Sequence, residues 1–143
     1  MDSLSPGTAI DRLYGILRWS LPIYVQDSHP WHVSREDVPC RMLDAAADDF
    51  LSYADQLAAA AQEVRWPIAP GGFPMRFTAL HDCSAVYLAR LAAERMKNDL
   101  ATIEQCVAAL ASWPEYQALA EEVFGNVRGH IERLHGASGP RAS

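Results

Sequence analysis

The chain has 143 residues, of which 50% are hydrophobic and 21% charged, which is the size and composition of one folded domain with its own core. Its 12 lysine and arginine residues stand against 18 aspartate and glutamate residues, so the net charge is −6. This balance argues against a nucleic acid or an anionic membrane as a partner, because both attract basic surfaces.

Alanine is abundant, with 23 residues against 8 glycines, while valine, isoleucine and threonine are scarce. Because alanine is the best helix former and β-branched residues favour strands, the composition predicts an all-α protein. We expect a single domain over residues 1–143, with its core in residues 8–135 and a flexible tail in residues 136–143. The excess of arginine over lysine is interpreted as a bacterial-type composition bias.

The start of the chain, MDSLSPGTAIDR, shows neither the basic nor the apolar region of a secretory signal. No stretch approaches the roughly 18 consecutive apolar residues of a membrane span. The three cysteines, Cys40, Cys83 and Cys106, are odd in number and far apart, which is typical of buried thiols in a reducing compartment. The sequence therefore predicts a cytoplasmic protein.

The first predicted helix covers about residues 8–26, with Thr8 as its cap and Asp11 in its first turn, where the positive helix end favours a carboxylate. Apolar residues recur at three- and four-residue steps and form one stripe: Ile10, Leu13, Tyr14, Leu17 and Leu21. Pro22 lacks an amide N–H and crowds the preceding turn, so we expect a kink or an early end there.

The second and fourth predicted helices, about residues 39–65 and 114–135, carry apolar stripes whose steps alternate between four and three. The first stripe consists of Leu43, Ala47, Phe50, Ala54, Leu57, Ala61 and Val64, and the second of Tyr116, Ala120, Val123, Val127, His130 and Leu134. This period of 3.5 is typical of helices that pack nearly parallel to their neighbours. Asp48, Asp49, Asp55 and Glu63 are expected to face away from the stripe.

The third predicted helix is the longest, about residues 78–112, with Thr78 as its cap. Its stripe contains one polar residue, Asp82, among Ala79, Val86, Ala89, Ala93, Met96, Leu100, Ile103, Val107 and Leu110. Four amphipathic helices of this size bury their stripes against one another, so we expect a single four-helix bundle.

A segment with three prolines, RWPIAPGGFPMRF, connects the second and third helices. In extended form it reaches roughly 40 Å, about the length of the second helix. It can therefore run back along the bundle as a crossover, which makes these two helices parallel. The alternative is an Ω-like loop that folds over one end and places Trp66, Phe73 and Phe77 on the core. We expect the crossover.

Two helix pairs joined by one long crossover resemble the ferritin-like bundles, and the segment GGFPMRFTALHD is similar to one in bacterial ferritin-like proteins. The resemblance covers about residues 8–135. It implies a di-metal site built from a glutamate on each of two helices and a Glu-x-x-His motif on each of the other two. The chain has one such motif, Glu132 with His135, and its other three helices depart from the pattern.

We therefore expect no cofactor, in a member of this superfamily that has lost the metal. Iron, zinc or haem is the alternative, with His130, Glu132, His135 and Asp82 as the candidate metal ligands. His130 lies on an apolar stripe, level with Met96 of the third helix, and such a pair could ligate haem. The other interpretation, which we favour, is a half-buried histidine hydrogen-bonded to a carboxylate.

Catalytic motifs are missing, since the chain has neither a G-x-S-x-G elbow nor a glycine loop followed by Gly-Lys-Ser/Thr. The sequence therefore favours a non-catalytic module that forms homodimers or binds another protein. A metal- or haem-binding ferritin-like protein is the alternative function.

Overall fold

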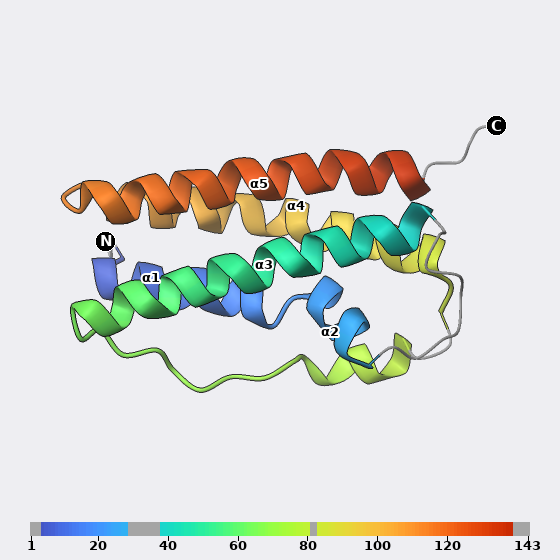
Figure 1. Cartoon of the computed structure of the whole chain (residues 1–143), viewed down its shortest axis with the longest axis horizontal. Coiled ribbons are helices and arrows are strands. Elements are labelled where there is room, and N and C mark those ends of the chain that lie inside the picture. The colour runs from blue at the N-terminus through green and yellow to red at the C-terminus, as the bar shows by residue number, and fades with distance from the viewer. Residues whose placement is uncertain (1–3, 29–37, 81–82, 139–143) are drawn as a thin grey trace.

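The computed structural model describes residues 4–28, 38–80 and 83–138 (Figure 1). Of these residues, 83% are helical and none belongs to a strand, which confirms the predicted all-α class. None of the helices within these ranges has the length and hydropathy needed to cross a membrane.

The N-terminal stretch forms two helices, α1 (Pro6–Arg18) and α2 (Leu21–Ser28), rather than the one continuous helix predicted. Ser5, not Thr8, caps α1, because the Ser5 hydroxyl accepts the Thr8 amide N–H at 3.2 Å. The interruption falls just before Pro22, which occupies the first turn of α2, where its missing N–H costs no helical hydrogen bond.

Helix α3 (Val38–Glu63) begins and ends within two residues of its predicted bounds. It buries the predicted stripe up to Ala61, together with Ala46 and Ala60. Its end is a Schellman motif, in which Trp66 N–H donates to the Ala61 carbonyl at 2.8 Å and Arg65 N–H to the Gln62 carbonyl at 3.2 Å. Arg65 takes the left-handed conformation of this motif, with φ at 62°.

The predicted third helix is shorter than expected. A 3₁₀ helix, η1 (Met75–Leu80), contains Thr78, and α4 (Ala85–Ala109) begins only after Ser84, whose hydroxyl accepts the Tyr87 N–H at 3.1 Å. Val86, predicted on the stripe, is 43% exposed, and Ala79 is exposed as well. The buried face of α4 instead starts with Ala85 and Leu88, so the predicted stripe was wrong over its first turns.

Helix α5 (Pro114–Ser138) starts at the predicted residue and buries the predicted stripe from Ala120 to Leu134. It does not end at Gly136, so the prediction of a flexible tail is wrong for residues 136–138. The remaining tail, residues 139–143, lies outside the described residues, and so does Asp82.

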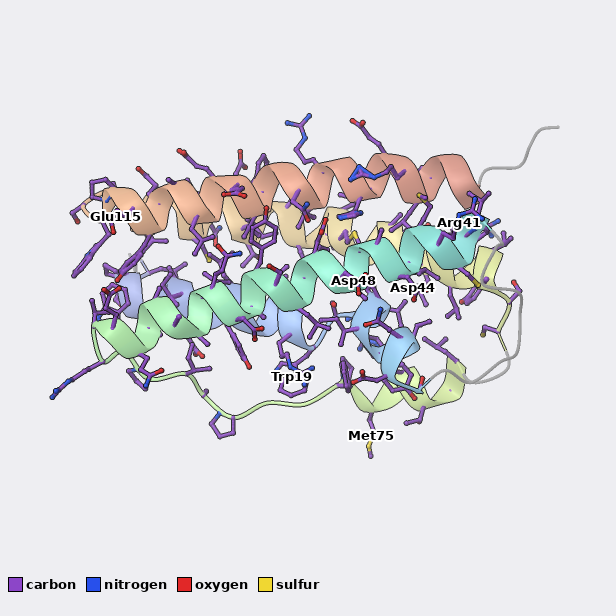
Figure 2. All side chains as sticks on the ribbon, in the orientation of Figure 1. Trp19, Arg41, Asp44, Asp48, Met75 and Glu115 are labelled. Carbon is purple, nitrogen blue, oxygen red and sulfur yellow. The ribbon has the colours of Figure 1, made fainter. Side chains whose placement is uncertain are left out.

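Figure 1 shows that α3 and α4 run in the same direction, while α1 and α5 run in the opposite one. The connection from α3 to η1 therefore runs back along the length of the molecule, as the crossover requires. It lies against α1 and α2, because Ala69 N–H donates to Asp11 Oδ1 at 2.9 Å and Phe73 contacts the rings of both Trp19 and Tyr24 at 5.2 Å. Figure 2 shows the Trp19 side chain pointing toward this connection.

Candidate functional site

The four candidate metal ligands do not converge within the described residues. His130 is buried, with 2% of its surface exposed, whereas Glu132 and His135 are exposed on α5, and Asp82 lies outside the described ranges. Glu132 follows His130 by two positions, which places the two side chains on opposite sides of a helix. The Glu132–His135 motif therefore points to solvent instead of into the core.

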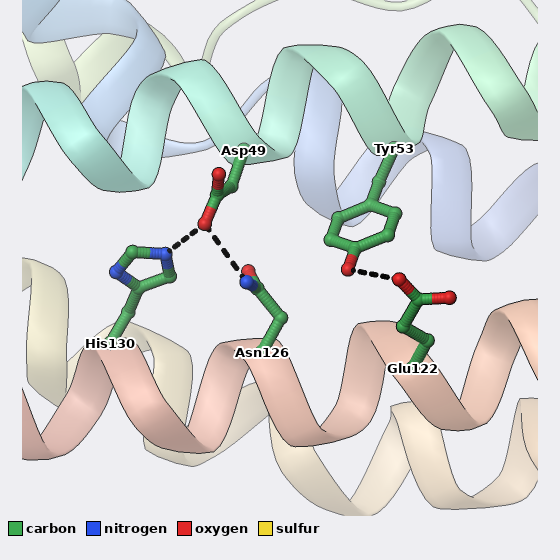
Figure 3. Close-up of polar contacts among 5 residues, drawn as sticks. All are labelled: Asp49, Tyr53, Glu122, Asn126 and His130. Carbon is green, nitrogen blue, oxygen red and sulfur yellow. Dashed lines mark hydrogen bonds and ion pairs between the residues drawn. The ribbon is translucent and has the colours of Figure 1, made fainter.

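His130 belongs to a polar cluster between α3 and α5 (Figure 3). Asp49 Oδ2 on α3 lies 2.7 Å from His130 Nε2 and accepts a hydrogen bond of 2.9 Å from Asn126 Nδ2. Asn126 and His130 are four residues apart, so they share one face of α5 and reach the same carboxylate. The predicted hydrogen bond of His130 to a carboxylate is confirmed, although the side chain is buried instead of half-buried. The prediction that Asp49 faces away from the core is wrong.

Burial lowers the pKa of His130, and this effect exceeds the opposing effect of the hydrogen bond that His130 donates to Asp49. The imidazole is therefore neutral at pH 7, and Nε2 carries the proton that it donates to Asp49. For Asp49, burial raises the pKa, but the hydrogen bonds from Asn126 and His130 outweigh it and hold the pKa below its ordinary value. The pair is thus a neutral donor facing a carboxylate.

Two tyrosine–glutamate pairs continue this contact toward the other end of α3. Tyr53 Oη donates to Glu122 Oε2, and Tyr116 Oη donates to Glu63 Oε1, each at 2.9 Å. Burial, together with the Glu122 hydrogen bond, raises the pKa of Tyr53 to about 12. Since one pair has its tyrosine on α3 and the other on α5, each helix supplies a donor and an acceptor to its neighbour.

The cluster does not fit the metal site that the ferritin-like resemblance implies. Within the described ranges, no group of three or more histidine, cysteine, aspartate or glutamate residues is placed to hold a metal ion. The haem interpretation also lacks support, because His130 Nε2 is committed to Asp49. The ring of His130 packs edge-on against Phe50, at 5.7 Å between centroids. The cluster therefore joins α3 to α5 through hydrogen bonds.

A groove of about 740 Å³ lies beside the tyrosine–glutamate pairs, between the C-terminal half of α3 and the start of α5. Figure 1 shows α3 diverging from α5 toward this end, where the bridging pairs use long tyrosine side chains instead of short aspartate and asparagine. Ala59, Ala60 and Leu119 provide its apolar part. Acidic residues also line it: Glu63, Glu115 and Glu122. Figure 2 shows Glu115 near the N-terminal end of α5.

Sequence reasoning missed this groove, because a stripe pattern indicates which faces pack but not how far two helices diverge. The fold and the groove define the chain as an all-helical protein with an acidic interhelical surface. No family model, curated protein or solved structure matches it.

Proposed function

We propose that this protein is a non-catalytic docking module whose α3–α5 groove binds a basic amphipathic helix of another protein. The observation that supports this proposal is the combination of an alanine- and leucine-lined floor with three glutamates around it. Alanine side chains let a partner helix approach closely, and an apolar helix face laid into a groove is a common mode of peptide recognition.

The charge of the groove favours another protein over a second copy of this chain. Two copies joined through this surface would bring Glu63, Glu115 and Glu122 of one chain toward the same residues of the other. Like charges brought together in an interface oppose association, whereas lysine and arginine on a partner helix would be attracted. The test must therefore distinguish a partner helix in the groove from the homodimer expected from the sequence.

The test uses a labelled synthetic helix of about 18 residues, with leucine on one face and lysine on the other, and measures fluorescence anisotropy. We expect the wild-type protein to bind this peptide and to bind it more weakly as salt is added, because salt screens the glutamates. A peptide with glutamate in place of lysine should not bind. Equal binding of the two peptides would contradict the proposal.

Ala59→Lys places a long cation on the exposed floor of the groove, and Ala101→Lys is its matched control on exposed α4 surface outside the groove. Both variants add one charge to a helix of similar propensity. We expect Ala59→Lys to weaken peptide binding about tenfold, or 1.4 kcal/mol, and Ala101→Lys to leave it nearly unchanged. An equal loss of peptide affinity in the two variants would refute the groove as the binding site. Self-association that Ala59→Lys abolishes in sedimentation equilibrium would instead identify a second copy as the occupant.

We also propose that the helices form a single four-helix bundle of ferritin-like topology in a cytoplasmic protein. The parallel course of α3 and α4 supports this topology, since a long crossover is its defining connection. The cysteine thiols, of which Cys40 and Cys106 are buried, support a reducing compartment.

A further inference from the structure

A pocket of about 340 Å³ opens where α1 ends and α2 begins, on the side of α4 that carries Arg95 and Asp99. Its volume is at the lower end of the range of small-molecule sites. Apolar side chains make up most of its wall, among them Leu17, Trp19 and Met96. It lies apart from the α3–α5 groove, since the two share no lining residue.

We infer that this pocket binds a small apolar amino acid, with Asp99 holding the ammonium group, Arg95 the carboxylate group and the apolar wall the side chain. The two charged residues are four positions apart on α4, so their Cβ atoms lie about 6 Å from one another on one helix face. This spacing suits a ligand whose two opposite charges are separated by a single carbon atom.

Within the described part of the chain, neither Arg95 nor Asp99 forms a salt bridge, although the two charges act on each other at longer range. The Arg95 guanidinium lies 4.9 Å from the centre of the Phe77 ring, which fixes it without cancelling its charge. Burial raises the pKa of Asp99, although the Arg95 charge opposes this effect. A ligand ammonium would supply the partner that this half-buried carboxylate lacks.

Two neighbouring features of the wall also indicate a ligand. Ser20 Oγ is buried without a hydrogen-bond partner among the described residues, which leaves a polar group available at the pocket. Gly15 lies in the interior of α1, where glycine weakens a helix, and a Cβ added there would meet no atom within 4 Å. The glycine therefore contributes empty space to the pocket.

Calorimetric titration with L-leucine and two analogues tests the inference: leucinamide, which lacks the carboxylate, and 4-methylpentanoate, which lacks the ammonium. We expect leucine to bind at least tenfold more tightly than either analogue. Asp99→Asn should weaken leucine and leucinamide but not 4-methylpentanoate, whereas Arg95→Gln should weaken leucine and 4-methylpentanoate but not leucinamide. Absence of leucine binding at about 10 mM, or equal binding of all three compounds, would overturn the inference.

Gly15→Leu tests the location without changing any charge, because the added side chain occupies the empty space and improves the helix propensity of α1. Gly125→Leu is the matched control, since Gly125 on α5 is exposed and lies outside the pocket. With circular dichroism showing both variants folded, leucine binding should fall at least tenfold in Gly15→Leu only. Unchanged binding in Gly15→Leu would place the site elsewhere and refute the assignment.

Discussion

His130 is a polar side chain that is nearly fully buried, and Asp49 is its acceptor. The same carboxylate oxygen also accepts from Asn126, so one residue of α3 satisfies two donors of α5. Such a shared acceptor fixes the position of one helix along the other, because sliding by one turn would leave at least one of the two donors without this acceptor.

Asp49→Ala should therefore destabilise the protein by about 2 kcal/mol, since the change leaves the buried His130 N–H and the Asn126 amide unpaired. Asp55→Ala on the exposed face of the same helix is the control and should stay within roughly 0.5 kcal/mol of wild type. Urea unfolding followed by circular dichroism measures both free energies. Equal stabilities of the two variants would show that the cluster contributes nothing.

His130 also predicts a pH dependence of stability. Burial and the nearby charge of Arg133 lower its pKa below 6.5, while the Asp49 carboxylate acts in the opposite direction. Below pH 6.5 the unfolded chain takes up a proton that folded His130 does not, so the free energy of unfolding falls as the pH falls. His130→Gln keeps a donor for Asp49 but does not titrate, and its stability should decline less between pH 7 and pH 5. Urea unfolding at each pH measures the free energies of both proteins. If these free energies fall equally between pH 7 and pH 5, the lowered pKa of His130 is contradicted.

At the level of the element, helix ends explain where the sequence prediction succeeded and failed. The stripes of α3 and α5 are long and regular, so their residues predicted both helices and most of their buried faces. Thr78 was predicted as the cap of the third helix, but it lies within η1, where its hydroxyl donates to the Met75 carbonyl, and Ser84 caps α4 instead. Asp49 was placed wrongly because it lies beside the stripe, where a small rotation of the helix decides whether a side chain meets its neighbour.

The end of α3 offers a test of backbone strain. Arg65 has a φ of 62°, a conformation in which a side chain collides with its own backbone and which glycine adopts freely. Arg65→Gly should therefore stabilise the protein by about 0.5–1 kcal/mol. Arg90→Gly, the same change on the exposed face of α4, should destabilise it by a similar amount, because glycine weakens a helix interior. Thermal unfolding should show a higher melting temperature for Arg65→Gly and a lower one for Arg90→Gly. A lower melting temperature in both variants would contradict backbone strain at Arg65.

At the scale of the whole molecule, the crossover connects residues that are distant in sequence. The length and prolines of the connection indicated that it could run along the molecule, but they could not specify what it packs against. In the structure Trp66 contacts Trp113 at 4.8 Å, and Phe73 contacts Trp19 and Tyr24. These aromatic contacts hold the connection to α1, α2 and the start of α5, which is the arrangement that keeps α3 and α4 parallel.

Gly71 is a position at which the crossover approaches the end of α1 closely. A Cβ added there would lie 2.5 Å from Trp19 Nε1, which is closer than a Cβ atom can pack, and 3.1 Å from Trp19 Cδ1, which is a tight contact. The indole has other contacts, since Arg18 lies 4.5 Å from its ring centre and Phe73 packs edge-on against it, and moving the indole would disturb both. Gly71→Ala should therefore push the connection away from α1, with a loss of about 1–2 kcal/mol and a changed tryptophan emission.

Gly72→Ala provides the control for this prediction, since a Cβ on the next residue would meet no atom within 4 Å and its φ is not positive. Alanine there restricts the unfolded chain without a clash, so Gly72→Ala should be neutral or more stable than wild type by up to about 1 kcal/mol. Urea unfolding and fluorescence on the two variants compare adjacent positions with the same added methyl group. If Gly71→Ala proves as stable as Gly72→Ala and its emission matches wild type, the crossover does not pack on Trp19 as the structure shows.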